Sequence, residues 1–144
     1  MPARDKTMVT VYLNTNGNAR EAADYYVRVF DAGEPSIMNY SDMPEADQAE
    51  TRGMEHLVMH ANVKTFGGDI MLSDNMPGET IEPTAAVSIC FSHEDPARLR
   101  TAFERLAQDG EILMPLEPTF FSPLYGMVKD KFGFHWMIMS SEEA

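Results

Sequence analysis

Side chains with the types and spacing of a catalytic or metal site are scarce in this sequence. Of the four histidines, His56 and His60 stand four residues apart, a spacing that makes a metal-binding pair on a helix. The surrounding segment 55–63 predicts a strand instead, on which the two side chains would share a face roughly 13 Å apart, too far to hold one ion. His93 lies at an expected helix start, where solvent exposure is expected. His135 is therefore the best functional candidate among the histidines.

Other catalytic patterns are missing, so we assign no catalytic residue. The sequence has no Gly-x-Ser-x-Gly elbow, no Walker loop and no Cys-x-x-Cys pair. The one cysteine, Cys90, lies in the apolar run 86–91, and we expect it to be a buried small hydrophobic side chain. The acidic pair at 142–143 reads as solvated charge in the tail.

Alternation along the last predicted strand points to a candidate ligand site. His135, Met137 and Met139 share one face of a strand over 134–140, since successive side chains alternate. An internal repeat places three further residues in matching positions, and an aromatic run at 120–125 adds a tyrosine that could form a pocket wall, a dimer contact or part of the core. The predicted ligand-binding residues are Asp69, Met71, Ser73, Tyr125, His135, Met137 and Met139. A concavity lined by methionines with a few polar groups suits a flat or irregular apolar ligand, unless the methionines merely fill the space.

The elements that would position these residues occur twice along the chain. The first copy reads as a strand at 9–13, a helix that Asn18 caps and Gly33 ends, and strands at 36–40, 55–63 and 69–74. The second reads as a strand at 85–91, a helix from Asp95 and Pro96 to Gly110, and strands at 111–115, 124–129 and 134–140. The offset between copies falls from 77 residues at the helix end to 66 at the last strand. The difference fits the acidic segment 41–50, which we expect to be a mobile hairpin loop.

The repeat predicts an α+β fold of two βαβββ modules within a single domain, 1–144. Module one covers 7–75, a linker covers 76–84 and module two covers 85–141. One helix can cover only one face of each four-stranded sheet. The other faces must therefore meet each other or enclose something, which predicts a cavity between two curved sheets.

Composition narrows the class of partner. The chain has 144 residues and a net charge of −12, with 11 basic against 23 acidic side chains. Because nucleic acids and anionic membranes attract clustered Lys and Arg, we expect neither as a partner. The beginning of the sequence lacks the apolar stretch of a signal peptide, and no run is long enough to span a bilayer, so we expect a cytoplasmic protein.

Three segments resemble a known family. The opening, Gly17-Asn18-Ala19-Arg20-Glu21-Ala22 leading into Tyr25-Tyr26 and Val29-Phe30, is similar to that of the PhnB-like proteins, as is Met71-Leu72-Ser73-Asp74. The close, Tyr125-Gly126-Met127-Val128-Lys129-Asp130-Lys131-Phe132-Gly133 followed by Trp136-Met137-Ile138, resembles that family's ending. These proteins belong to the glyoxalase, bleomycin-resistance and extradiol-dioxygenase superfamily, also called vicinal oxygen chelate. The resemblance implies paired βαβββ modules, a homodimer and ligand sites in the sheet concavities. Members are often labelled after demethylubiquinone methyltransferase, but this sequence has no glycine-rich strand-turn-helix for a nucleotide-like cofactor.

The resemblance also implies a metal site, from which this sequence departs. Metal-dependent members carry a glutamate ligand four residues after the glycine that precedes the last strand. Here Gly133 leads to Met137, and in the first module Gly67 leads to Met71. Thioethers are poor ligands for Mg, Mn, Ni or Zn, and neither first strand contains a histidine. We therefore expect no metal and no other cofactor, a divalent metal being the alternative.

Three functional hypotheses remain. The first is a binding protein for a small apolar or aromatic molecule, as in bleomycin-resistance relatives, by analogy of fold. The second is a metal-dependent lyase, isomerase or dioxygenase with atypical ligands, in which His60, Asp69 or His135 acts as acid or base. The third is a non-catalytic assembly or regulatory module.

Overall fold

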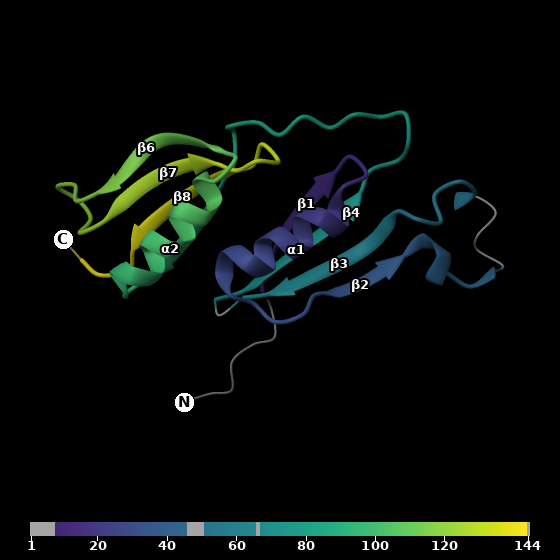
Figure 1. Ribbon diagram of the computed structural model, residues 1–144, viewed down its shortest axis with the longest axis horizontal. Coiled ribbons are helices and arrows are strands. Elements are labelled where there is room, and N and C mark those ends of the chain that lie inside the picture. Colours follow the sequence, from purple (N-terminus) through teal and green to yellow (C-terminus); the bar gives the residue numbers. More distant parts are fainter. Residues whose placement is uncertain (1–7, 46–50, 66, 144) are drawn as a thin grey trace.

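The computed structural model describes residues 8–45, 51–65 and 67–143. Its elements form two copies of one unit, a strand and a helix followed by three strands (Figure 1). The first unit holds β1 (Val11–Thr15), α1 (Ala19–Phe30), β2 (Ser36–Asn39), β3 (Val58–Lys64) and β4 (Asp69–Asp74). The second holds β5 (Ser88–His93), α2 (Pro96–Ala107), β6 (Glu111–Glu117), β7 (Tyr125–Lys129) and β8 (His135–Ser140). The α+β fold of two βαβββ modules is thus confirmed, with strand boundaries shifted by up to three residues.

Each unit folds into a mixed four-stranded sheet with the same topology. The strand orders are β1-β4-β3-β2 and β5-β8-β7-β6. The first strand of each unit runs parallel to the last, and the other pairs are antiparallel. Among the described residues, the two sheets share no strand pairing. The last strand of each unit therefore lies inside its sheet, whereas the first strand forms an edge.

The two helices form where apolar residues recur at helical spacing. Along α1, Ala19, Ala22, Ala23, Tyr26 and Phe30 are all buried, as the periodicity predicts. Along α2, Leu99, Ala102, Phe103 and Leu106 are buried, and Asp95 caps the helix by accepting a hydrogen bond from the backbone N–H of Ala97.

The glycines proposed as helix stops do not act as left-handed caps. Asp31 (φ 50°) follows α1 and Asp109 (φ 62°) lies just beyond α2, so aspartates take the left-handed conformation in both modules. A short polar side chain tolerates that conformation better than most residues do. Gly110 is needed for another reason, because a Cβ there would lie 2.7 Å from the carbonyl oxygen of Leu106.

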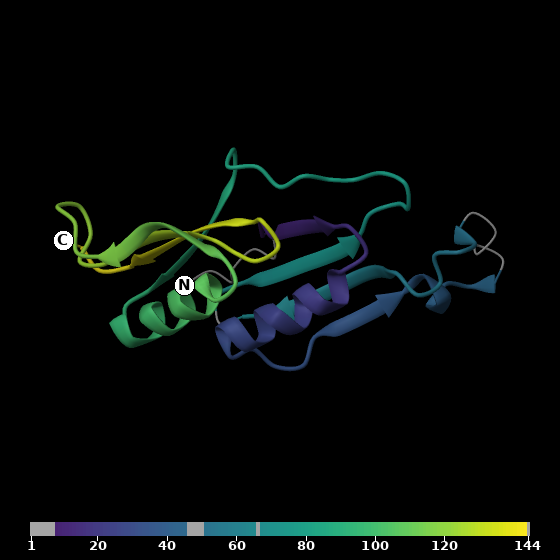
Figure 2. The ribbon, with the colours of Figure 1, turned by 45° about the horizontal axis from the view of Figure 1, so that its top comes forward.

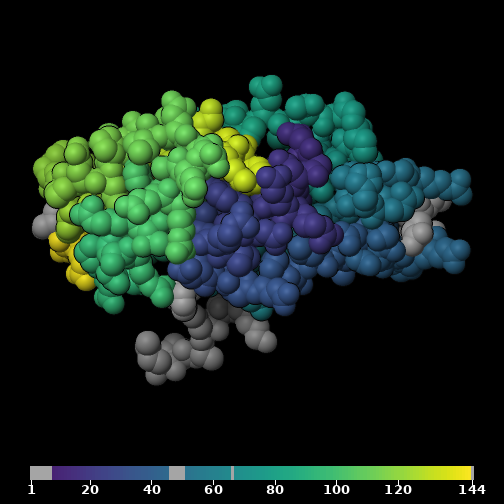
Figure 3. All heavy atoms as spheres, viewed as in Figure 1, coloured from purple at the N-terminus to yellow at the C-terminus, as the bar shows by residue number. Residues whose placement is uncertain are grey.

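Both helices lie on the same side of the sheets, where they pack against each other (Figures 1 and 2). The aromatic core crosses the boundary between the modules. The ring of Phe30 in α1 lies 5.0 Å from that of Phe91 in β5 and 5.1 Å from that of Trp136 in β8. Figure 3 shows the second module directly against α1 on this side. No helix of the described residues covers the opposite face of either sheet, which we call the open face.

The remaining segments are irregular. The predicted acidic loop begins with a short 3₁₀ turn at Tyr40–Asp42, and 46–50 lie outside the described residues. The outer edge strands are also irregular, since β2 and β6 both show register shifts and β6 contains Pro115. No helix in the described part of the chain is long and apolar enough to cross a membrane.

Candidate functional site

The strand register places the predicted ligand-binding residues on the open faces. In β4 and β8, buried residues alternate with half-buried ones, and the half-buried set is the predicted one. Asp69, Met71 and Ser73 therefore lie on the open face of the first sheet. His135, Met137, Met139 and Tyr125 lie on that of the second, where Tyr125 pairs with Met139. Their role in binding stays a prediction.

The open face of the second sheet carries a line of sulfur atoms. Cys90 in β5 pairs with Met137 in β8, which pairs with Met127 in β7, which in turn pairs with Met114 in β6. We call these four residues the sulfur row. The expectation that Cys90 is buried is wrong, because alternation directs Ile89 and Phe91 toward the helix side and leaves the thiol exposed.

The open face of the first sheet is more polar. The Tyr12 hydroxyl lies 3.4 Å from Nδ1 of His60, and the Asn62 amide donates a hydrogen bond of 3.1 Å to Asp69. His56 precedes β3 and is exposed, whereas His60 lies on the sheet. The two histidines of the His-x-x-x-His spacing therefore have different surroundings.

Two buried polar atoms have no hydrogen-bond partner among the described residues. They are Oδ1 of Asn62 and Nδ1 of His135. Asn62 contacts Asp69, the first residue of β4, and His135 is the first residue of β8, so the two atoms lie at corresponding ends of the two open faces. Buried polar atoms are nearly always hydrogen-bonded in folded proteins. Each marks a place where a group from outside the chain would be stabilised.

The donor set does not fit a hard divalent ion. Within the described ranges, no group of three or more His, Cys, Asp or Glu side chains is placed to hold a metal. The positions where the resemblance implies glutamates hold Met71 and Met137, whose thioethers bind Mg, Mn, Ni or Zn poorly.

A cavity of about 610 Å³ lies between the two modules, where the edge strands β1 and β5 approach each other. We call it the seam pocket. Its apolar lining comes from Val11, Phe30, Ile70, Ile89, Phe91 and Trp136, and its polar lining includes Asp69, Cys90, Ser92, His93 and Arg98. Its volume lies in the range typical of small-molecule sites, roughly 300–1,000 Å³. Of the seven predicted ligand-binding residues, Asp69 is the one that lines it.

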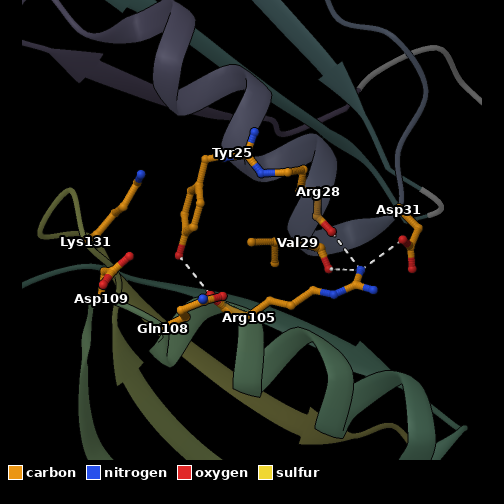
Figure 4. Close-up of a pocket in the computed structure, with 8 residues that line it drawn as sticks. All are labelled: Tyr25, Arg28, Val29, Asp31, Arg105, Gln108, Asp109 and Lys131. Carbon is orange, nitrogen blue, oxygen red and sulfur yellow. Dashed lines mark hydrogen bonds and ion pairs between the residues drawn. The ribbon is translucent and has the colours of Figure 1, made fainter.

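A second cavity, of about 530 Å³, separates the ends of the two helices (Figure 4). The Tyr25 hydroxyl donates to the carbonyl of Leu106 at 3.3 Å. Arg105 reaches across to the end of α1, where Nη1 donates to the carbonyl of Arg28 at 2.7 Å and to Asp31 at 2.9 Å. Burial, and then the negative charge of Asp130, raise the pKa of Tyr25. The polar groups of this lining are hydrogen-bonded across the two helices, so we interpret the cavity as part of the helix–helix contact and not as a ligand site.

Two buried aspartates connect the elements that surround the site. The sequence analysis assigned no role to either of them. Asp130 accepts hydrogen bonds from the Tyr26 hydroxyl at 2.5 Å, from Trp136 Nε1 at 2.9 Å and from the backbone N–H groups of Phe132 and Phe134. Because Tyr26 lies on α1, this carboxylate joins the first helix to the β7–β8 turn of the other module. The one feature of the sequence that could have indicated this role is the position of Asp130 within the closing motif.

Asp74 plays the matching part inside the first module. It accepts hydrogen bonds of 2.9 Å from Thr15 Oγ1 and from the backbone N–H groups of Ala19 and Val58. The start of α1 is therefore capped by Asp74, since Asn18 makes no side-chain cap bond there.

Comparison with known proteins identifies relatives along nearly the whole chain. The family model described as 3-demethylubiquinone-9 3-methyltransferase matches residues 6–139. Protein YjdN of Escherichia coli is 35% identical over 134 residues, covering 88% of this chain and 90% of YjdN.

Comparison with solved structures identifies the same relationship. Protein PA1353 from Pseudomonas aeruginosa has a TM-score of 0.78 at 32% identity, covering 94% of this chain and 98% of PA1353. The PhnB protein from Bacillus cereus has a TM-score of 0.70 at 31% identity, covering 94% of this chain and 100% of that protein. A glyoxalase/bleomycin resistance protein from Albidiferax ferrireducens shares the fold, with a TM-score of 0.64 at 9% identity over 94% of this chain and 98% of that one. The chain therefore belongs to the family described as 3-demethylubiquinone-9 3-methyltransferase, as a PhnB-like member with the vicinal oxygen chelate fold.

Proposed function

We propose that this protein binds a small, largely apolar organic molecule without the hard divalent metal of its metal-dependent relatives. The observation that carries the proposal is the seam pocket, a cavity of about 610 Å³ with apolar walls supplied by both modules. Small-molecule sites are concave, mostly apolar and frequently formed where two structural units meet.

The lining indicates the chemistry of the ligand. Phe91 and Trp136 offer aromatic surface, which favours a flat ring system. The charges of Asp69 and Arg98 in the lining are opposite and balance each other. A neutral aromatic molecule of one or two rings fits this environment.

We further propose that two copies of the chain associate through their open faces to form a homodimer. These faces carry half-buried methionines, and Met114 on the edge strand β6 and Phe120 and Phe121 in the following loop are exposed. Exposed apolar surface that is contiguous marks an interaction site, and we propose that this surface is one. A second copy would cover these faces, leaving Met71, Ser73, Met137 and Met139 to line the enclosed space with Tyr125 and His135. Light scattering of the purified protein measures the molar mass and so the oligomeric state, with Met139→Lys as the variant expected to disrupt the dimer.

Binding to the seam pocket is tested with prodan, a neutral naphthalene dye whose emission shifts to the blue in apolar surroundings. The chain has one tryptophan, Trp136, and it lines the pocket, so bound dye accepts its excitation energy. We expect saturable binding, with quenching of Trp136 and sensitised dye emission.

A matched pair of variants locates the dye. Ile89→Phe adds bulk to the pocket wall, whereas Ile112→Phe makes the same change on β6, where the side chain is 53% exposed. We expect at least tenfold weaker binding for Ile89→Phe and wild-type binding for Ile112→Phe. If both variants bound prodan with equal affinity, the dye would not occupy the seam pocket and the proposal would be wrong.

The competing hypotheses have their own outcomes. Stoichiometric Ni, Mn, Fe or Zn that is lost when His60 or His135 is replaced would favour a metal-dependent enzyme. A natural ligand at 100 times its dissociation constant adds about 2.7 kcal/mol of stability. The absence of any thermal shift across a broad library of apolar compounds would favour an assembly or regulatory module.

A further inference from the structure

We propose that the sulfur row is a binding site for one soft monovalent cation, Cu(I) or its analogue Ag(I), centred on Met137 and held by Cys90 and Met127 on either side of it. The sulfur row lies on the open face of the second sheet and shares Cys90 with the lining of the seam pocket, but binding of the cation does not require a ligand in that pocket. It starts from the disagreement described above, in which thioethers stand where the fold family places hard ligands.

The register of the sheet places neighbouring members of the sulfur row side by side. Each member pairs directly with the next across neighbouring strands, from β5 through β8 and β7 to β6. Side chains that pair directly across a sheet have Cβ atoms about 4.5–5.5 Å apart. A methionine has three rotatable bonds, so its sulfur can move toward a neighbour without any change in the backbone. Met137, flanked by Cys90 and Met127, is the natural centre of the site.

In the single chain, the row is accessible to an ion from solution. Cys90 is exposed, Met114 is 42% exposed, and Met127 and Met137 are half-buried. Methionines that filled the core would lie on the helix side of the sheet, where Val128, Trp136 and Ile138 are buried instead. Among the described residues, the thiol has one polar contact, at 3.6 Å from the Ser92 hydroxyl, which leaves its sulfur available.

The donor chemistry selects the cation. Thiolate and thioether sulfur are soft ligands that favour Cu(I), whereas carboxylate and water favour Mg, Ca and Mn. On binding, the Cys90 thiol releases its proton to solvent and the sulfur donates an electron pair to the cation. The copper stays in the Cu(I) state in which it is supplied, so no oxidant or reductant takes part. One thiolate neutralises the single positive charge, and the thioethers add neutral ligands.

The test is a Cu(I) titration of the reduced protein under anaerobic conditions, in competition with a coloured Cu(I) chelator. Native mass spectrometry with Ag(I) gives the stoichiometry. We expect one equivalent bound, and little competition from Zn(II). Because any free thiol binds these ions, Cys90→Ser alone is not decisive. The decisive variant is Met127→Leu with Met137→Leu, which removes two thioethers and nearly conserves side-chain volume.

The expected result is at least a tenfold loss of Cu(I) affinity in the double variant. Met71→Leu is the matched control, since it removes a half-buried thioether from the open face of the other sheet and should bind as the wild type does. Circular dichroism and prodan binding confirm that the double variant is folded. Wild-type affinity in the folded double variant would overturn the proposal, because the thiol alone would then account for binding. Equally tight binding of Zn(II) would overturn it as well.

Discussion

Replacing Tyr26 with phenylalanine should weaken the joint between the two modules by a predictable amount. The Tyr26 side chain is fully buried, and its hydroxyl donates to the Asp130 carboxylate at 2.5 Å. The change removes one oxygen, leaves the ring contacts with Phe132 and Trp136 in place, and reduces the donors on Asp130 from four to three. A hydrogen bond to a charged group contributes about 1.5–3 kcal/mol, so we expect the free energy of unfolding to fall by that amount.

The neighbouring tyrosine supplies the control. Tyr25 is 5% exposed, but its hydroxyl donates to the neutral carbonyl of Leu106 at 3.3 Å, for which about 0.5–1.5 kcal/mol is typical. Urea unfolding followed by the fluorescence of Trp136, which itself donates to Asp130, measures both variants. If Tyr26→Phe cost no more than Tyr25→Phe, the buried carboxylate would not be the joint that we describe.

Three further predictions concern stability. Asp74→Ala should cost about 3 kcal/mol, because it leaves the buried backbone N–H groups of Ala19 and Val58 without an acceptor, while Thr15 keeps its bond to the carbonyl of Ser73. Loss of the exposed cap in Asp95→Ala should cost about 1 kcal/mol in the same urea assay. Gly110→Ala should cost about 1–3 kcal/mol because its methyl group meets backbone, whereas Gly33→Ala, with nothing within 4 Å, should change the unfolding midpoint little. Burial, and then the charge of Asp130, raise the pKa of Tyr26 well above its ordinary value. Only the unfolded chain then loses that proton just above pH 10, so stability is complete below about pH 10 and falls as the pH rises further. Tyr26→Phe should flatten this fall in urea midpoints measured between about pH 9 and 11, and an unchanged slope would contradict the assignment.

The architecture could be predicted from the sequence because the two modules repeat both their periodicity and their motifs. Apolar stripes at helical spacing identify both helices, and short apolar runs in 69–74 and 135–140, each preceded by glycine, identify the strands that lie inside each sheet. Helix ends were harder to predict. A glycine near a helix end suggests a left-handed cap, but Asp31 and Asp109 take that conformation here.

The site could be predicted only in part. Alternation assigns each residue of a strand to a face, which places Met71 and Met137 on the open faces. It does not give the register between strands, and that register is what aligns Cys90 with Met137 and forms the sulfur row. The seam pocket depends on how the two modules pack together, which no local pattern encodes. The joint at Asp130 was missed for the same reason, since its partner Tyr26 lies 104 positions away in the sequence.

The irregular outer strands bear on how this protein behaves at high concentration. A straight, exposed sheet edge is a template on which another chain can add a strand, the first step toward aggregation. In β6, Pro115 lacks the N–H that such an addition needs, and the register shifts in β2 and β6 bend both edges away from the regular form. Fibril growth by lateral strand addition is therefore disfavoured at either outer edge.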